Sequence, residues 1–394
     1  MFREDTIAKF RTIQTPFYYY DMELLRKTLS TCAGVAGRFG YKLHYALKAN
    51  SNPEVLSVIS GAGYGADCVS GNEIRAAVEN GFNPKQIMFS GVGKSDAEIR
   101  LALQLGIQSL NVESRQEMEI IDELAGAIGL KAGISLRIIP NVDARTHRYI
   151  TTGLEENKFG ILPWEFDRVL ETLKQLGNLR LKGLHFHIGS QITDLGVFKS
   201  LCHRINDINE WFISNQVRAE IINVGGGLGI DYQDPDRNPV PDFGEYFRVF
   251  KDFIRLQPDQ ELHFEPGRAL VGQCGSLITK VLFVKKGVNT RFAIVDAGMN
   301  DLIRPALYQS YHRMENLTSV DPPEKYDVVG PICESSDCFG KAVSLPKTRR
   351  NDLLAIRSAG AYGQTMSSRY NLRDLAAAFY SDRGIAFRNI IRDI

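Results

Sequence analysis

The stretch Glu220-Ile-Ile-Asn-Val-Gly-Gly-Gly-Leu-Gly229 joins a short apolar run to a glycine turn. The apolar residues favour a buried strand, and the glycines favour a turn with accessible backbone N–H groups. Seven other strand-like runs resemble it, and most of them also end in a residue able to do chemistry. These runs are 42–48, 64–67, 87–90, 109–112, 134–138, 183–187 and 261–265. Polar residues at one end of eight parallel strands are typical of the catalytic face of a (β/α)8 barrel.

Helix-like segments separate these runs. Three serine–glutamate pairs have the S-x-x-E spacing of a capping box at a helix start: Ser70 with Glu73, Ser95 with Glu98, and Ser114 with Glu117. Longer helices are expected at 163–176, 197–216 and 242–257. The span from 43 to 265 is close to the roughly 250 residues that such a barrel needs.

After Gly267 the pattern changes to short β-rich runs with Gly and Pro between them. We expect strands at 275–284, 291–295, 326–330 and 352–356, and we expect the strand-like segment 15–21 to join them. The prediction is an α/β protein with two domains. A barrel covers residues 25–268, and an all-β domain, barrel- or sandwich-like, is built from residues 1–24 and 269–394.

The composition is that of an ordinary globular protein, with 44% hydrophobic and 24% charged residues in a chain of 394. A net charge of +1 gives no electrostatic case for a nucleic-acid or membrane partner. No apolar run is long enough to span a bilayer, and the first ten residues lack a signal-peptide core. Six cysteines without a Cys-x-x-Cys pair predict neither a disulfide framework nor a metal site, so we expect a reducing cytoplasmic location.

Lysine and glycine positions suggest a phosphorylated carbonyl cofactor. Lys48 ends an apolar run, and partial desolvation there favours the neutral amine that reacts with a carbonyl group. A solvated lysine at a strand end explains this run equally well. The turn 225–227 offers bare N–H groups to a phosphate, and Glu265-Pro-Gly-Arg268 adds a second anion site one strand later. Barrels usually bind phosphate after their last two strands, which is where these two segments fall.

Three further side chains each have a functional and a structural interpretation. His187 suits a ring stacked on a flat cofactor, with Ser190 near the phosphate, but it could be an ordinary core histidine. Glu265 suits a protonated ring nitrogen, which keeps a cofactor electron-poor, but it could be a surface acid. Neighbouring acids favour the thiol form of Cys333, a proton donor, although the sequence alone favours a buried structural cysteine.

Seven motifs, in order over nearly the whole chain, resemble the diaminopimelate decarboxylase family. This family belongs to the alanine racemase/ornithine decarboxylase type of pyridoxal-phosphate (PLP) enzyme, fold type III. The motifs are Tyr45-Ala-Leu-Lys-Ala-Asn50, Gly65-Ala-Asp-Cys-Val-Ser-Gly71, His185-Phe-His-Ile-Gly-Ser-Gln191, Gly225-Gly-Gly-Leu-Gly229, Glu265-Pro-Gly-Arg268, Cys333-Glu-Ser-Ser-Asp337 and Gly360-Ala-Tyr362. The segments 145–153 and 156–160 also resemble a loop of that family, whereas 364–374 fits it only loosely.

The resemblance implies PLP as cofactor, a homodimer with shared active sites, and a role for each motif. Lys48 would carry PLP and His187 would stack on its ring. Glu265 would hold the ring nitrogen, and Asp67 and Glu73 would support the cofactor. Phosphate would be bound by Gly225, Gly226, Gly227, Ser190, Gly267, Arg268 and Tyr362. Cys333 would donate a proton from the partner subunit, and the substrate would be held by Arg268, Arg304, Tyr308, Glu334 and Tyr362.

These roles imply the decarboxylation of meso-2,6-diaminopimelate to L-lysine and CO2, the last step of lysine biosynthesis. Arginines suit the distal carboxylate and Glu334 suits the distal ammonium. Three alternatives remain open at this point. A decarboxylase of ornithine or arginine would have no distal carboxylate to bind, an amino-acid racemase would need a second base, and a non-catalytic partner-binding relative should have lost the lysine or the glycine turn.

Overall fold

The computed structural model describes residues 2–143 and 158–382, so the predicted family loop up to residue 157 lies outside the described residues. Contacts divide the chain into two compact units. The barrel unit comprises Leu29–Gly229 and Asp242–Gly267, and the β unit comprises Met1–Thr28, Ile230–Pro241 and Arg268–Ile394. The predicted domain limits of 25–268 and of 1–24 with 269–394 stay a prediction. They did not anticipate that 230–241 groups with the β unit.

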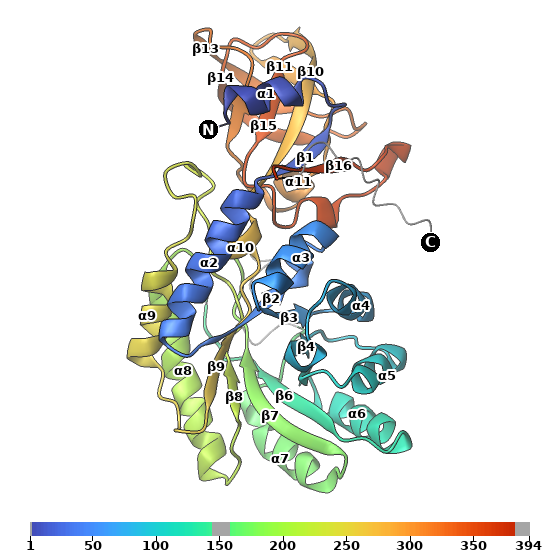
Figure 1. Ribbon diagram of the computed structural model, residues 1–394, viewed down its shortest axis with the longest axis vertical. Helices are drawn as coiled ribbons and strands as arrows, with labels where there is room; N and C mark the ends of the chain where they lie inside the picture. Colours follow the sequence, from blue (N-terminus) through green and yellow to red (C-terminus); the bar gives the residue numbers. More distant parts are fainter. Residues whose placement is uncertain (1, 144–157, 383–394) are drawn as a thin grey trace. The chain divides into compact units, whose positions relative to one another are not determined.

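Eight parallel strands close into a barrel in the barrel unit (Figure 1). The strands are β2 (Lys42–Ala46), β3 (Gly65–Cys68), β4 (Ile87–Phe89), β5 (Ser109–Val112), β6 (Ala132–Ile138), β7 (Leu179–Phe186), β8 (Ile221–Asn223) and β9 (Glu261–Phe264). The ring closes between β9 and β2, where Lys42 lies opposite His263. All eight predicted runs contribute to these strands, which confirms the predicted (β/α)8 barrel.

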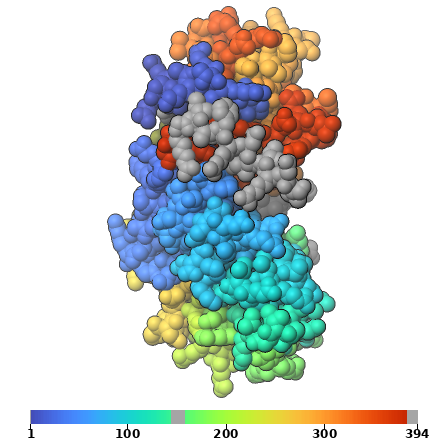
Figure 2. Space-filling model, turned by 45° about the vertical axis from the view of Figure 1, so that its right-hand side comes forward, coloured from blue at the N-terminus to red at the C-terminus, as the bar shows by residue number. Residues whose placement is uncertain are grey.

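A helix follows each barrel strand from β2 to β8. These helices are α3 (Pro53–Gly61), α4 (Gly71–Glu79), α5 (Asp96–Leu105), α6 (Arg115–Ala127), α7 (Phe166–Gln175), α8 (Leu195–Ser214) and α9 (Phe243–Phe253). Each buries apolar residues spaced three or four apart, which is why these segments fold as helices on a sheet. In Figure 2 the visible surface of this unit runs from blue through green to yellow along the sequence.

The predicted capping boxes are correct in one case of three. At α5, Ser95 and Glu98 bond reciprocally and form a complete box. In the other two helices the serine caps the N3 amide as expected, but the glutamate accepts from the N–H one residue before the cap: Glu73 from Val69, and Glu117 from Glu113. These two glutamates therefore tie each helix start to the end of the preceding strand.

The β unit is built on an eight-stranded sheet. Its main path is β12 (Met314–Asn316), β15 (Leu353–Ile356), β10 (Gly275–Lys286), β11 (Arg291–Val295), β13 (Pro323–Val329) and β14 (Cys338–Pro346). The amino-terminal strand β1 (Phe17–Tyr20) pairs with β10 and with β16 (Ala377–Tyr380), as predicted for this segment. The unit also holds short helices, including α1 (Glu4–Phe10), α10 (Arg268–Val271) and α11 (Arg304–Tyr308), so it is mostly rather than wholly β.

All six cysteines are free. Among residues 2–143 and 158–382, no helix combines the length and the apolar character needed to cross a bilayer.

Candidate active site

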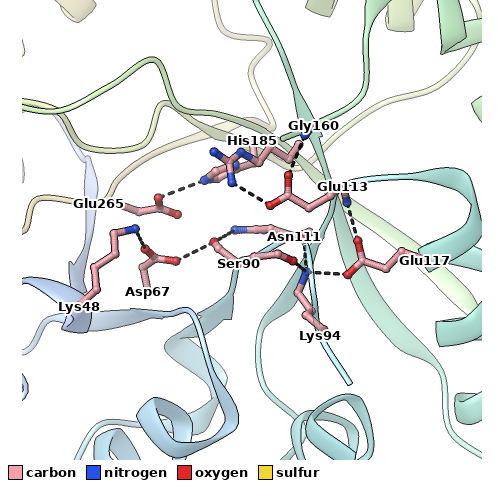
Figure 3. A network of polar contacts seen from close by, with 12 residues as sticks. Lys48, Asp67, Ser90, Lys94, Asn111, Glu113, Glu117, Gly160, His185 and Glu265 are labelled. Carbon is pink, nitrogen blue, oxygen red and sulfur yellow. Dashed lines mark hydrogen bonds and ion pairs between the residues drawn. The ribbon is translucent and has the colours of Figure 1, made fainter. Parts of the chain in front are cut away.

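The carboxyl end of β2 places Lys48 against a buried acid. Lys48 lies in a short 3-10 turn (Leu47–Ala49), and its Nζ is 3.3 Å from Oδ2 of Asp67 on β3 (Figure 3). The Asp67 side chain is fully buried, whereas the Lys48 side chain is 35% exposed. Ser90 Oγ donates to the other oxygen of Asp67 at 2.7 Å, and Asn111 Nδ2 donates to Ser90 at 2.9 Å. The lysine therefore meets an acid whose orientation is fixed from behind.

Burial sets the protonation of Asp67. Burial and then the negative charge of Glu265 raise the pKa of Asp67, and Lys48 acts in the opposite direction. Asp67 therefore lies beside the Lys48 amine as an acceptor whose orientation is fixed by Ser90.

Glu265, directly after β9, is held by two partners in the barrel interior. Its Oε2 is 3.0 Å from His185 Nε2, and its Oε1 accepts from Asn223 Nδ2 at 2.7 Å. Burial would raise the pKa of Glu265, but the charge and hydrogen bond of His185 outweigh it and hold this pKa well below its usual range. The surface-acid reading of Glu265 is wrong, because this residue is only 5% exposed. An ionised carboxylate here is suited to a protonated ring nitrogen.

His187 and the glycine turn lie beside one another. The Gly226 N–H points to His187 Nδ1 at 3.4 Å. Burial, reinforced by the charges of Lys48 and Arg137, holds the pKa of His187 well below its usual value. The imidazole is therefore neutral, as a ring that stacks on a flat cofactor should be. Ser190 follows three residues later on the same connection and is partly exposed.

The glycine turn has a packing function that its sequence did not reveal. A Cβ on Gly225, whose φ is +70°, would lie 2.4 Å from the Phe186 carbonyl oxygen. A Cβ on Gly226 would lie 2.3 Å from the carbonyl oxygen of Glu265. Larger residues would collide with the ends of β7 and β9. The turn thus forms a side-chain-free cradle directly beside Glu265, which fits the phosphate end of PLP.

Two further acids of the barrel unit, Glu73 and Glu113, lie near this centre. Glu73, at the start of α4, accepts from the Val69 N–H at 2.8 Å, and burial raises its pKa to about 7. Glu113 binds buried Arg137 at 2.8 Å and also accepts from the Gly160 N–H at 2.8 Å (Figure 3). Arg137 lies in the predicted run 134–138 and Glu113 directly follows the run 109–112, but the sequence analysis assigned a role to neither residue.

The β unit gathers three of the predicted substrate and phosphate residues. Arg268 begins α10 and Arg304 begins α11. The Nη1 atoms of both arginines donate to the hydroxyl oxygen of Tyr232, each at 2.6 Å. The Arg268 guanidinium lies 4.8 Å from the ring centre of Tyr362. Sequence reasoning missed Tyr232, because nothing in its local pattern shows that residues 230–241 fold with this unit. Tyr308 lies one helical turn beyond Arg304, at the other end of α11.

Cys333 and Glu334 lie on an exposed loop between β13 and β14. The buried-cysteine reading of the sequence is wrong, because Cys333 is exposed. The loop is shaped from inside by buried Asp337, whose carboxylate accepts from the Met299 and Ile332 N–H groups, both at 2.7 Å. This anchoring directs the tip outward and leaves the thiol and the Glu334 carboxylate on the surface of a single chain.

Comparison with known proteins identifies relatives over almost the whole chain. Residues 25–272 match the family model "Pyridoxal-dependent decarboxylase, pyridoxal binding domain". The chain is 57% identical to diaminopimelate decarboxylase of Bacteroides thetaiotaomicron over 95% of this chain and 98% of that protein. It is 42% identical to the Helicobacter pylori enzyme of the same name, over 98% of this chain and 96% of the other.

Solved structures agree with the sequence comparison. The crystal structure of diaminopimelate decarboxylase from Helicobacter pylori complexed with L-lysine is similar with a TM-score of 0.90 and 40% identity, covering 95% of this chain and 93% of that one. A lysine/ornithine decarboxylase from Vibrio vulnificus has a TM-score of 0.83 at 20% identity, over 97% and 99% of the two chains, which shows a shared fold. The resemblance inferred from the motifs is confirmed.

Proposed function

The chain belongs to the pyridoxal-dependent decarboxylase family, and within it to the diaminopimelate decarboxylases. From this premise we propose that it converts meso-2,6-diaminopimelate to L-lysine and CO2. The observation that carries the substrate choice is the pair of buried arginines, Arg268 and Arg304, which share one hydroxyl oxygen in the β unit. Two guanidinium groups side by side suit a carboxylate on the substrate end that does not react.

Most of the residues that would hold PLP belong to the barrel unit, whereas Arg268 and Tyr362 belong to the β unit. Lys48 would hold it through Nζ, His187 would stack on its ring, Glu265 would face its ring nitrogen, and the cradle at 225–227 would take its phosphate together with Ser190, Gly267, Arg268 and Tyr362. When bound, PLP supplies an electron-accepting ring that stabilises the charge left on carbon as CO2 departs. Asp67 would orient the Lys48 amine through the contact between its Oδ2 and Nζ, and Asp67 with Glu73 would support this side of the cofactor. Glu265 stays ionised because of its bond to His185, so it can keep a ring nitrogen protonated.

Residues of the β unit would recognise the substrate and make the final proton transfer. Arg268, Arg304, Tyr308 and Tyr362 would bind the distal carboxylate, and Glu334 the distal ammonium. Cys333 would give its thiol proton to the carbon that lost CO2. We further propose that the chain works as a cytoplasmic homodimer in which Cys333 and Glu334 serve the partner's site. The exposure of both side chains on a loop that Asp337 anchors supports this.

A substrate panel tests the proposed function. Purified protein with PLP is given meso-diaminopimelate, ornithine, arginine or lysine, and CO2 release is measured. We expect efficient turnover of diaminopimelate alone, because only this substrate carries a distal carboxylate together with a distal ammonium. A preference for ornithine or arginine would replace the proposal by the alternative basic amino-acid decarboxylase. Failure to bind PLP would favour the non-catalytic relative.

A further inference from the structure

The hydroxyl of Tyr232 contacts both arginines, although Tyr232 belongs to none of the seven sequence motifs. It is on the segment Ile230–Pro241, which directly follows the glycine turn in sequence and folds with the β unit. Its ring is 9% exposed and packs edge-on against His312, with ring centres 5.0 Å apart. Its hydroxyl oxygen accepts from Arg268 Nη1 and from Arg304 Nη1, both at 2.6 Å.

Two buried guanidinium groups on one oxygen repel each other, so this arrangement needs a compensating group. Among the described residues, the acids that follow Tyr232 in sequence form ion pairs with other arginines: Asp234 with Arg313, and Asp236 with Arg357. Burial and then the charge of Arg304 lower the pKa of His312 to about 3, so this ring adds no charge. Burial raises the pKa of Tyr232, but the two arginines outweigh it and lower this pKa below its ordinary value. The phenol oxygen is thus the hydrogen-bond acceptor that both guanidinium groups share.

We propose that Tyr232 is a positioning residue that holds Arg268 and Arg304 together as a preassembled receptor for the distal carboxylate of the substrate, and so contributes to selection of diaminopimelate over ornithine. This inference rests on the proposed function. A second feature points to an incoming acceptor, since Arg304 Nε is buried with no hydrogen-bond partner among the described residues. A preassembled pair of arginines increases the affinity for the substrate, because substrate binding no longer has to order the two side chains.

Tyr232→Phe tests this inference, because it keeps the ring and its contact with His312 and removes only the shared acceptor. We expect KM for meso-diaminopimelate to rise roughly ten- to hundredfold with a smaller change in kcat. Any slow turnover of ornithine should be unchanged, because ornithine has no distal carboxylate, so the selectivity ratio should fall by the same factor. Tyr326→Phe is the matched control. It removes another buried hydroxyl of the β unit, bonded to Glu324 and to the Thr348 N–H, and should leave KM and selectivity unchanged.

A second variant guards against a Tyr232→Phe chain that does not fold. In Arg304→Gln, one of the two donors is lost while the phenol remains. The near-ultraviolet absorbance of ionised tyrosine should then appear at higher pH than in the wild type. The inference on Tyr232 is overturned if KM is unchanged in Tyr232→Phe, or if the tyrosine titration is unchanged in Arg304→Gln. If the wild-type protein still turns over diaminopimelate in that case, the proposed function stands. Wild-type protein without that activity would overturn the proposed function itself.

Discussion

His185 Nε2 lies 3.0 Å from Glu265 Oε2 in the barrel interior, and both side chains are at least 95% buried. The pair joins the end of β7 to the end of β9, and Asn223 on the intervening strand β8 bonds the second oxygen of Glu265. Three neighbouring strands thus fix one carboxylate in one orientation and one charge state. This is the environment that a group must have if it is to keep a cofactor ring protonated in a site with little water.

Glu265→Gln should slow decarboxylation by two or more orders of magnitude while PLP still binds, because an amide cannot hold a protonated ring nitrogen by charge. Single-turnover kinetics and the absorbance of bound cofactor would separate the two effects. Glu261→Gln, at the exposed start of the same strand, is the matched control and should retain kcat. A normal kcat in Glu265→Gln would reduce Glu265 to a packing residue.

Lys48→Ala should abolish the yellow absorbance of lysine-bound cofactor and nearly all turnover, with the fold intact by circular dichroism. The physical reason is the loss of the only group proposed to attack the carbonyl of PLP. Lys42→Ala, at the opposite end of β2 and half-exposed, should behave as wild type. An active, yellow Lys48→Ala protein would refute the assignment of the cofactor lysine.

Glu73 predicts a pH dependence of stability. Its pKa is raised from 4.5 to about 7 by burial, so between these values the folded chain holds a proton that the unfolded chain has lost. Stability from this group is therefore lost as the pH rises through that window. Relative to Glu73→Gln, wild-type apoprotein should lose roughly 2–3 kcal/mol of unfolding free energy between pH 4.5 and pH 7. Denaturant unfolding at several pH values measures this, with Glu79→Gln on the same helix as control. A constant difference would contradict the raised pKa.

Glu334→Gln should cost about 2–4 kcal/mol in transition-state binding of meso-diaminopimelate, because a desolvated charged contact to the distal ammonium is lost. The ratio of kcat/KM between variant and wild type measures this cost. Ser335→Ala, also exposed on the same loop, is the control. If Glu334→Gln kept the wild-type kcat/KM, this glutamate would have no part in substrate recognition.

Mixing two inactive variants tests the shared active site. Lys48→Ala and Cys333→Ala chains should each be weak or dead alone, because each lacks one of the two groups. After subunit exchange about a quarter of wild-type activity should return, since half of the dimers are mixed and each mixed dimer has one intact site of two. No recovery despite demonstrated exchange would mean that each chain builds its site alone.

The fold could be predicted from sequence because its signal is local and repeated. Each barrel strand is a short apolar run followed by a turn and a capped helix, and eight repeats in order leave few other architectures. The amino-terminal strand was also predictable, since the run Phe17-Tyr-Tyr-Tyr20 is wholly aromatic and aromatic residues favour strands. The charged residues and glycines at the strand ends could be identified from the sequence for the same reason.

The features of the site that could not be predicted from the sequence depend on tertiary contacts. Tyr232 meets Arg268 and Arg304 only because residues 230–241 leave the barrel unit and fold with the β unit. The glycines at 225 and 226 are required by carbonyl oxygens from two other strands. The exposure of Cys333 follows from the anchoring by Asp337. Asp337 is near Cys333 in sequence, but its contact with the Met299 N–H is not, and the partners of Tyr232 and of the two glycines are also distant, so no spacing rule could have indicated these contacts.

The most direct test of the central claim is the product balance from a single defined substrate. Wild-type protein saturated with PLP is incubated with meso-2,6-diaminopimelate, and L-lysine and CO2 are both quantified over time. We predict that the two products appear in equal amounts, with one substrate molecule consumed for each. Consumption of diaminopimelate without CO2, or no consumption at all by folded, PLP-loaded protein, would contradict it.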